Sequence, residues 1–325
     1  MGTKEQLLEL FENNKGMYFS GEDLAEQLTV SRTAVWKAVK SLRSEGYNID
    51  AVQNKGYCLS LETDILSVQG IQKYLKSVCK DIRLDVLPTV YSTNATVREK
   101  AAEGEPEGYV VVANSQTNGR GRNGRSFYSP SDTGVYFSLL LRPRCYAAEQ
   151  AVKLTTMAAV AVCEAIEAVS DEKAEIKWVN DIFVREKKVC GILTEASFGL
   201  ENGYLEYAVL GIGINVSQPE EGFPEEIAQV AGAVFQETRN DGKNLLAAEC
   251  LNRFMEYYSN PQDTDYVKEY RRRSFVIGRD ITVISANSQR NAVALDVDED
   301  CCLIVKYEDG TTDRLFSGEI SVRPR

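Results

Sequence analysis

Positive charge and glycine are concentrated in one short segment, residues 119–125, which read Gly-Arg-Gly-Arg-Asn-Gly-Arg. No acidic residue stands between Gly108 and Ser131, so the arginines of this segment lack a neighbouring carboxylate in the sequence. Guanidinium groups bind carboxylate or phosphate in bidentate fashion, and glycines allow a backbone to approach a ligand closely. The segment therefore predicts an anion-binding loop, although a flexible, solvated surface turn explains its composition equally well.

The glycine spacing of this loop also matches two phosphate-binding motifs. Gly119, Gly121 and Gly124 fit G-x-G-x-x-G, and residues 119–126 fit a P-loop if Arg125 replaces the lysine. Both motifs need a helix directly afterwards, whose amino terminus faces the phosphates. The following Phe-Tyr-Ser-Pro-Ser-Asp-Thr-Gly predicts a turn and then a strand, so we expect neither motif to be genuine.

A second polar cluster alternates with apolar residues between positions 177 and 192; its members are Lys177, Asn180, Asp181, Lys187 and Lys188. Asparagine and aspartate oxygens suit Mg²⁺, and lysines suit phosphate or carboxylate. A β-turn followed by a solvated lysine hairpin tip explains the same residues, and taken alone this second interpretation is favoured.

Two weaker signals complete the set. Residues 211–216, Gly-Ile-Gly-Ile-Asn-Val, place glycines inside an apolar strand, which indicates close approach by a ligand or, equally, by a packed helix. Ser92-Thr93-Asn94 precedes a helical pattern and is most often a helix cap.

The composition restricts the chemistry further. The 325 residues include 37 basic and 48 acidic side chains and no histidine, which excludes Ser-His-Asp and Cys-His nucleophiles and His-ligated zinc. The eight cysteines form no C-x-x-C pair and lie in apolar runs, which indicates reduced, buried thiols and a cytoplasmic protein. We expect no membrane span and no signal peptide.

Residues 1–63 predict three short helices and a hairpin. The second and third helices are joined by a three-residue turn at 29–31, which is typical of a helix-turn-helix. Residues 46–57 predict a hairpin with its turn at 53–56, the wing of a winged helix. We expect the third helix to pack one apolar face against the rest, formed by Val35, Trp36, Val39 and Leu42.

Charge on this third helix favours DNA as its partner. No acid stands between Glu26 and Glu45, and the amino-terminal end of such a helix meets base edges and phosphates. A helical protein-interaction module with a solvated basic face is the less favoured alternative. A single module would bind weakly, so we expect a dimer on a two-fold site. The predicted DNA-binding residues are Ser31, Arg32, Thr33, Lys37 and Lys40.

The remainder predicts two further parts. Strands expected at 82–87, 109–113, 135–141, 191–196 and 204–216, with helices at 147–169, 245–258 and 266–271, indicate one α/β domain. Short alternating strands at 280–285, 291–297, 303–307 and 312–316, around turns at 286–288 and 309–310, predict a small β-barrel.

Together and in this order, the four clusters resemble those of the bifunctional biotin protein ligases, which also repress the biotin operon. The family pattern is a Gly-Arg-Gly-Arg-x-Gly-Arg loop, a Lys-Trp-Pro-Asn-Asp turn, a lysine followed by Gly-Ile-Leu, and Gly-x-Gly-x-Asn-Val. The counterparts here are residues 119–125, 177–181, 188–193 and 211–216. Val179 stands where proline is usual, and Asn123 where a further arginine is common.

The resemblance implies an α/β (α+β) fold in three domains. These are a winged helix-turn-helix over residues 1–63, a mixed α/β ligase domain resembling class II synthetase cores over 64–271, and a small SH3-like β-barrel over 272–325. Many ligases of the family lack the helix-turn-helix, so its presence here favours a repressor.

The resemblance also implies a two-step reaction. Biotin and ATP, with Mg²⁺, give biotinyl-5′-AMP and pyrophosphate, and a lysine of the biotin carboxyl carrier protein then takes the biotinyl group. Catalysis would fall to Lys188, Arg122 and Asp181, with Asp181 also a Mg²⁺ ligand. Biotin would be bound by Ser92, Thr93, Asn94, Gln116, Arg120, Gly121, Arg122, Lys188, Gly211 and Gly213. The nucleotide would be bound by Arg122, Arg125, Lys177, Asn180 and Asn215.

Two alternatives remain. A lipoate-type acyl ligase shares the adenylation chemistry but should lack the arginine-glycine loop. A catalytically inactive biotin-sensing repressor would have no need of Lys188, Asp181 and the loop arginines, all of which are present. We further expect the loop, together with residues 219–234, to be mobile without ligand and to close over the adenylate.

Overall fold

The computed structural model describes residues 2–143, 151–198, 205–237, 239–260, 264–285, 288–316 and 319–322. Cys145, Tyr204, the start of the helix predicted at 147–169 and part of the turn predicted at 286–288 lie outside this range. The chain divides into two compact units, residues 1–76 with 237–248, and residues 77–236 with 249–325. The three domain boundaries drawn from the sequence stay a prediction.

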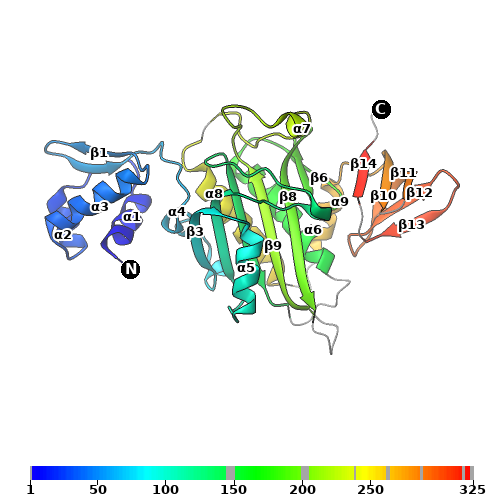
Figure 1. Ribbon diagram of the computed structural model, residues 1–325, viewed down its shortest axis with the longest axis horizontal. Coiled ribbons are helices and arrows are strands. Elements are labelled where there is room, and N and C mark those ends of the chain that lie inside the picture. The colour runs from blue at the N-terminus through cyan, green and yellow to red at the C-terminus, as the bar shows by residue number, and fades with distance from the viewer. Residues whose placement is uncertain are drawn as a thin grey trace. The chain divides into compact units, whose positions relative to one another are not determined.

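The first unit contains the expected three helices and hairpin, drawn in blue in Figure 1. They are α1 (Thr3–Asn13), α2 (Gly21–Gln27) and α3 (Arg32–Ser44), followed by β1 (Ile49–Val52) and β2 (Gly56–Leu59). Ser20 and Asp23 form a capping box at α2, and the Ser31 hydroxyl accepts a hydrogen bond from the backbone N–H of Ala34 at the start of α3. These caps explain why α2 begins after Ser20 and α3 after Ser31.

The apolar face of α3 is narrower than predicted. Val35, Val39 and Leu42 are buried in the core of this unit, but Trp36 is 52% exposed. The prediction that Trp36 packs into the core was wrong. Residues four apart share a helix face, so Trp36 lies with Arg32 and Lys40 on the outer side.

A buried ionic network lies within the same unit. Glu12 of α1 accepts a hydrogen bond from Lys73 at 2.8 Å, and Lys15 pairs with Asp241 at 2.9 Å. The four side chains are each at most 10% exposed. Burial raises the pKa of Asp241, but hydrogen bonds and ion pairs from Lys73 and Lys15 outweigh it, so the pKa lies below its ordinary value. The stabilisation from Asp241 is therefore lost as pH falls through that lowered pKa.

Replacing Asp241 with asparagine should destabilise the first unit by about 3 kcal/mol, because two buried lysines lose their shared carboxylate. The measurement is hydrogen exchange at the amides of α1, which reports local opening of this unit. Glu45→Gln is the matched control, since its pair with Lys4 is largely exposed and should contribute less than about 1 kcal/mol. Equal effects of the two substitutions would contradict a stabilising role for the buried network.

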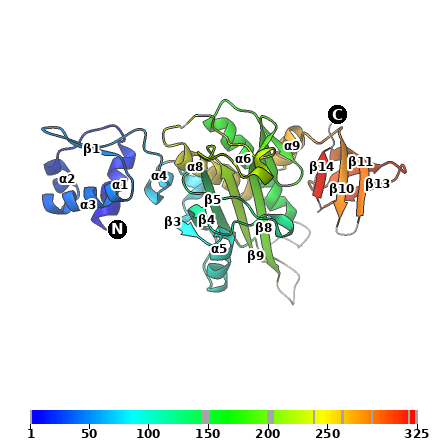
Figure 2. The same ribbon diagram turned by 45° about the horizontal axis from the view of Figure 1, so that its top comes forward.

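The second unit contains a seven-stranded mixed sheet with the order β3-β4-β5-β9-β8-β7-β6. The bounds are β3 (Arg83–Val90), β4 (Tyr109–Gln116), β5 (Gly134–Leu141), β6 (Ala174–Lys177), β7 (Asp181–Val184), β8 (Lys187–Phe198) and β9 (Leu205–Asn215). Strands β4, β5, β9 and β8 run side by side in Figure 1 and Figure 2. Each of the five strands predicted from the sequence is present, whereas β6 and β7 were missed because four residues give too little pattern.

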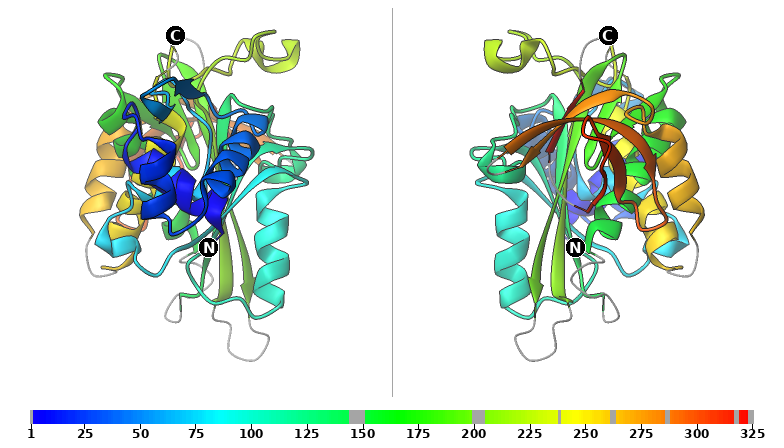
Figure 3. Two further views of the ribbon diagram at one scale, coloured as in Figure 1. Left: turned by 90° about the vertical axis from the view of Figure 1, so that its left-hand side faces the viewer. Right: turned by 90° about the vertical axis from the view of Figure 1, so that its right-hand side faces the viewer.

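Helices cover both faces of this sheet. Figure 3 shows the cyan helix α5 (Thr93–Ala102) on one face and the green α6 (Ala151–Val169) and orange α9 (Asp265–Arg273) on the other. Val97 of α5 packs with Val111, Leu140 and Val209 of the strands beneath it. Three short helices of the second unit lie between strands in the sequence: η1 (Ser77–Cys79), η2 (Arg122–Gly124) and α7 (Glu225–Ala228). Helix α4 (Val68–Gln72) belongs to the first unit. Helix α8 (Gly242–Tyr258) begins in the first unit and ends in the second.

The carboxyl-terminal residues of the second unit form a five-stranded antiparallel sheet with the order β13-β12-β11-β10-β14. Its strands are β10 (Asp280–Ser285), β11 (Ser288–Val297), β12 (Leu303–Tyr307), β13 (Thr312–Leu315) and β14 (Glu319–Val322). The β-rich character was predicted correctly, and β14 was missed. Within the described part of the chain, no helix has the length and apolar character needed to span a membrane.

Candidate active site

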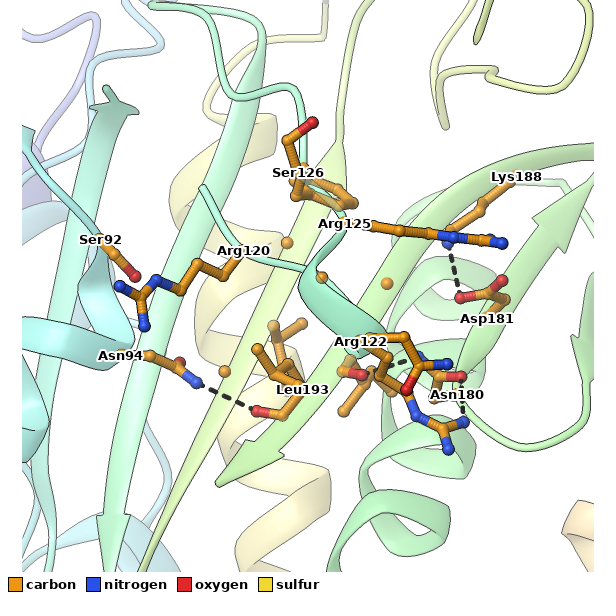
Figure 4. Close-up of a pocket in the computed structure, with 18 of the residues that line it drawn as sticks. Ser92, Asn94, Arg120, Arg122, Arg125, Ser126, Asn180, Asp181, Lys188 and Leu193 are labelled. Carbon is orange, nitrogen blue, oxygen red and sulfur yellow. Dashed lines mark hydrogen bonds and ion pairs between the residues drawn. The ribbon is translucent and has the colours of Figure 1, made fainter. Parts of the chain in front are cut away.

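One pocket of the second unit collects side chains from all four sequence clusters (Figure 4). It is lined by the start of α5, the end of β4, the loop at 120–127, the β6–β7 turn, the first half of β8 and the centre of β9. Every residue predicted to bind biotin lies on its wall, as do Arg125, Lys177, Asn180 and Asp181. Asn215 is outside it and donates to the carbonyl of Gly232 at 3.0 Å.

Strand register explains why residues so far apart in sequence meet here. Asp181 of β7 pairs with Gly191 of β8, which pairs with Gly213 of β9. Neighbouring residues in an antiparallel row point to the same face of a sheet, so a carboxylate and two positions without side chains lie in one row. This row forms a flat floor with a charged edge.

Lys188 and Asp181 form an ion pair at that edge, with 2.6 Å between Nζ and Oδ1 (Figure 4). Their side chains are 31% and 22% exposed, so solvent and ligands reach both. An ammonium that is paired but accessible can exchange its partner for the carboxylate of a ligand without a large desolvation cost.

Two arginines of the loop, Arg122 and Arg120, contact side chains from other parts of the chain. Nη1 of Arg122 donates to Oδ1 of Asn180 at 3.2 Å, and Nδ2 of Asn180 donates to the carbonyl of Ile192 at 2.8 Å. The guanidinium of Arg120 lies 6.0 Å from the ring centre of Tyr91. The loop is followed by the turn into β5 rather than by a helix, so the two phosphate-motif matches were correctly set aside.

The opposite end of the pocket, toward which Arg120 points in Figure 4, is a network of hydroxyl and amide hydrogen bonds. Oε1 of Gln116 accepts from the backbone N–H of Thr93 at 2.9 Å and from its hydroxyl at 3.2 Å, and Nε2 donates to Ser129 at 2.9 Å. Ser138 lies within 2.8 Å of the Thr93 hydroxyl. Such hydroxyls can reorient toward either donors or acceptors of a polar ligand.

Asn94 has most of its hydrogen-bonding capacity engaged within the protein. Nδ2 donates to Glu195 at 2.8 Å and to the carbonyl of Leu193 at 3.3 Å, while Oδ1 accepts from Ser138 at 2.6 Å. Arg98, one helical turn along α5, pairs with the same Glu195. Asn94 therefore shapes the wall and leaves one lone pair for a ligand.

The glycines of β9 make room for two side chains, of which the sequence analysis singled out Asn94 but not Phe127. A Cβ on Gly213 would lie 2.6 Å from the ring of Phe127, and one on Gly211 would collide with the side-chain oxygen of Asn94. Because Asn94 belongs to α5, the helix-packing explanation holds for Gly211, whereas Gly213 makes room for an aromatic ring over the floor. Phe127 follows directly after the arginines, and that proximity could have indicated it.

Two buried hydrogen bonds, to residues distant in the sequence, fix the position of the β6–β7 turn. Trp178 donates through Nε1 to the carbonyl of Cys301 at 3.0 Å, and the hydroxyl of Tyr270 donates to the carbonyl of Val179 at 3.0 Å. The Trp178–Val179 peptide is cis. Burial raises the pKa of Tyr270 well above its ordinary value, so it acts only as a neutral donor. These partners are distant in the sequence, and no local pattern could have identified them.

The segment expected to help close the site contacts the start of β8. The backbone N–H of Lys188 donates to Val230 at 2.8 Å, and that of Gly232 donates to Lys188 at 2.9 Å. Asn215 also accepts a backbone bond from Val234 at 2.9 Å. This contact gives the predicted nucleotide residue Asn215 a role in anchoring the segment beside Lys188.

The donor set fits Mg²⁺ bound together with a nucleotide. Among the described residues that line the pocket, Asp181 is the one carboxylate, with the Asn180 amide beside it. Mg²⁺ in nucleotide sites is held by one or two carboxylates, phosphate oxygens and water, so a single carboxylate suffices. No group of three or more His, Cys, Asp or Glu side chains that could hold a metal ion occurs among the described residues.

The residues predicted to bind DNA lie on the outer face of α3. Arg32, Thr33, Lys37 and Lys40 are exposed. The Ser31 hydroxyl caps the helix by accepting a hydrogen bond at 3.2 Å.

Comparison with known proteins places these features in a family. Residues 3–58 match the model of the HTH domain, residues 86–215 that of the biotin/lipoate A/B protein ligase family, and residues 276–323 that of the biotin protein ligase C terminal domain. The bifunctional ligase/repressor BirA of Bacillus spizizenii is 33% identical over 98% of both chains. The chain belongs to the family of bifunctional biotin ligase/repressors.

More distant relatives agree with this assignment. The bifunctional ligase/repressor BirA of Escherichia coli is 27% identical over 95% of this chain and 94% of its own. The structure of biotin protein ligase from Aquifex aeolicus in complex with biotin and ATP aligns with a TM-score of 0.62 at 27% identity, covering 75% of this chain and 99% of that one. The identification from sequence is confirmed, as is the order of helix-turn-helix, ligase and carboxyl-terminal parts.

Proposed function

We propose that this protein joins biotin to ATP to form biotinyl-5′-AMP, and transfers the biotinyl group to a lysine of biotin carboxyl carrier protein. One observation carries the proposal: Arg120, Arg122 and Lys188 line one pocket with a hydrogen-bonding network at its far end. Biotin has the matching shape, with a polar ureido ring at one end and a carboxylate at the other.

In the first step two anions must meet. A biotin carboxylate oxygen attacks the α-phosphorus of ATP, the bond to the bridging oxygen breaks, and pyrophosphate leaves with its electrons. Lys188 exchanges Asp181 for the biotin carboxylate, and Arg122 neutralises the phosphate that the carboxylate approaches. Positioning and charge neutralisation dominate such transfers. Asp181 and Asn180 would hold Mg²⁺ together with ATP, and the ion would further neutralise the phosphates.

In the second step an uncharged amine attacks the acyl carbon. The amine of the carrier lysine displaces AMP and forms an amide, and it must lose a proton as it does so. Asp181, released from Lys188, accepts that proton or orients the amine. Lys188 then stabilises the negative charge that develops on the acyl oxygen. No imidazole is needed at either step.

At the far end, Ser92, Thr93 and Gln116 bind the ureido group, and Phe127 packs beside the bicyclic ring over Gly213. Arg125, Lys177 and Asn180 bind the nucleotide, and Asn215 supports it through the segment it anchors. Asn94 with Gly211 and Gly121 sets the shape of the biotin pocket.

We propose further that the protein represses biotin genes as a homodimer on operator DNA, through the outer face of α3. A dimer is expected because one module offers few cations for binding. A cytoplasmic location is supported by the cysteines among the described residues, which are buried and form no disulfide; they are Cys58, Cys79, Cys163, Cys190, Cys250, Cys301 and Cys302.

The test is incubation of the purified protein with labelled biotin, ATP, Mg²⁺ and a biotin-acceptor domain. Labelled acceptor is expected, and lipoate in place of biotin should give none. Labelled lipoyl acceptor would favour the lipoate-type alternative. Absence of any labelled acceptor, with retained biotin-dependent DNA binding, would favour the inactive sensor.

A further inference from the structure

An unexplained tryptophan lies on the outer face of α3. Trp36 is 52% exposed, although an aromatic ring of this size gains more free energy from burial than almost any other side chain. Both neighbours along the helix axis are cations, Arg32 one turn before and Lys40 one turn after. Nζ of Lys40 lies 5.4 Å from the centre of the Trp36 ring.

The surroundings of the ring identify the kind of partner. Arg32, Lys37 and Lys40 are all exposed, and α3 carries no acidic residue. An apolar ring among cations fits a surface that carries apolar groups between rows of anions. The major groove of DNA is such a surface, because phosphates border it and each thymine presents a methyl group inside it. An α-helix also has the width that the groove admits.

We infer that Trp36 reads sequence, by packing its ring against thymine methyl groups while Lys40, stacked on that ring, contacts a neighbouring phosphate. The inference rests on the proposed DNA-binding function and assigns it a chemical preference. Polar side chains on the same face position the helix, whereas the apolar ring discriminates thymine from cytosine, which lacks the methyl group.

The experiment uses the full-length protein with biotin, ATP and Mg²⁺. Selection from a pool of random DNA duplexes gives an enriched sequence, in which each thymine is then replaced in turn by deoxyuridine. This replacement removes the methyl group and keeps the base pair. We expect one or more of these replacements to weaken wild-type binding about three- to ten-fold, and to leave the binding of Trp36→Ala unchanged.

Trp36→Ala should bind the enriched duplex about ten- to one-hundred-fold more weakly, with the salt dependence unchanged because no cation is lost. Lys40→Ala should reduce the salt slope instead. Leu61→Ala removes another exposed apolar side chain of this unit, 56% exposed, and should bind as the wild type does. Hydrogen exchange at the amides of α1 reports that the first unit is folded in all three variants.

Three outcomes would overturn the inference, the first two through Trp36 itself and the third through the repressor function. Equal weakening of wild type and Trp36→Ala by deoxyuridine, or undiminished binding by Trp36→Ala, would show that the ring does not read methyl groups. A pool from which the wild type enriches no sequence would overturn the repressor function, and the inference with it. In that case the ring would have to serve a protein partner.

Discussion

Lys188→Ala should lower the rate of biotinyl-5′-AMP formation by about two to three orders of magnitude, the cost of removing one charge-stabilising donor from a preorganised site. The ammonium of Lys188 acts before and after the attack on ATP. It binds the carboxylate of biotin first and the acyl oxygen of biotinyl-5′-AMP afterwards. The substitution should therefore raise the KM for biotin as well as lower kcat. Release of pyrophosphate in a single turnover measures the first step without the carrier protein.

Two companion variants make this result specific. Lys173→Ala removes a lysine whose side chain is 73% exposed and which does not line the pocket, and it should react at the wild-type rate. Asp181→Asn removes the partner of Lys188 but keeps the cation, so adenylate formation should fall less than in Lys188→Ala. Adenylate formation by Lys188→Ala within about three-fold of the wild type would exclude Lys188 as the group that neutralises the carboxylate.

The features that the sequence predicted well share a physical basis. Caps, glycine turns and long alternating runs act within a few residues of one another, so α2, α3, the wing and the central strands could all be recognised locally. The chemical clusters could be recognised for a related reason, because a loop that binds anions must carry its cations and glycines close together.

What escaped prediction depends on contacts between distant segments. Tyr270 and the carbonyl of Cys301 support the turn at Trp178 from far along the chain, and Glu195 fixes the amide of Asn94 across the fold. No periodicity encodes such pairs. Most polar and charged residues of the pocket lining could therefore be predicted, whereas Phe127 and the side chains that support the lining could be recognised only from the structure.

The misplacement of Trp36 has a different cause. Apolar character was taken as evidence of burial, although position 36 departs from the spacing of the buried residues Val35, Val39 and Leu42. When apolar character and spacing disagree, spacing is the better guide, because the geometry of the helix determines which face each side chain lies on. At position 36 the exposed ring is flanked on its face by Arg32 and Lys40, and this combination, rather than exposure alone, indicates a binding surface.

Arg122→Gly should shorten the lifetime of enzyme-bound biotinyl-5′-AMP by about ten- to one-hundred-fold. The reason is that Arg122 joins the loop to Asn180, and a hydrogen bond to a charged group contributes about 1.5–3 kcal/mol. With that connection lost, the loop opens and the mixed anhydride leaves before the carrier lysine arrives. Retention of labelled adenylate after rapid gel filtration measures the lifetime, and labelling of an unrelated lysine-rich protein measures the escape.

A double-variant comparison separates loop closure from general damage. Asn180→Ala removes the same hydrogen bond and keeps the arginine, so it should also shorten the lifetime, and the combined variant should be little worse than Arg122→Gly alone. Lys173→Ala should retain the adenylate as the wild type does. If Arg122→Gly holds the adenylate as long as the wild type, the loop does not close through Asn180. If the two substitutions simply add, Arg122 and Asn180 act on the adenylate separately, and the contact between them has no part in retaining it.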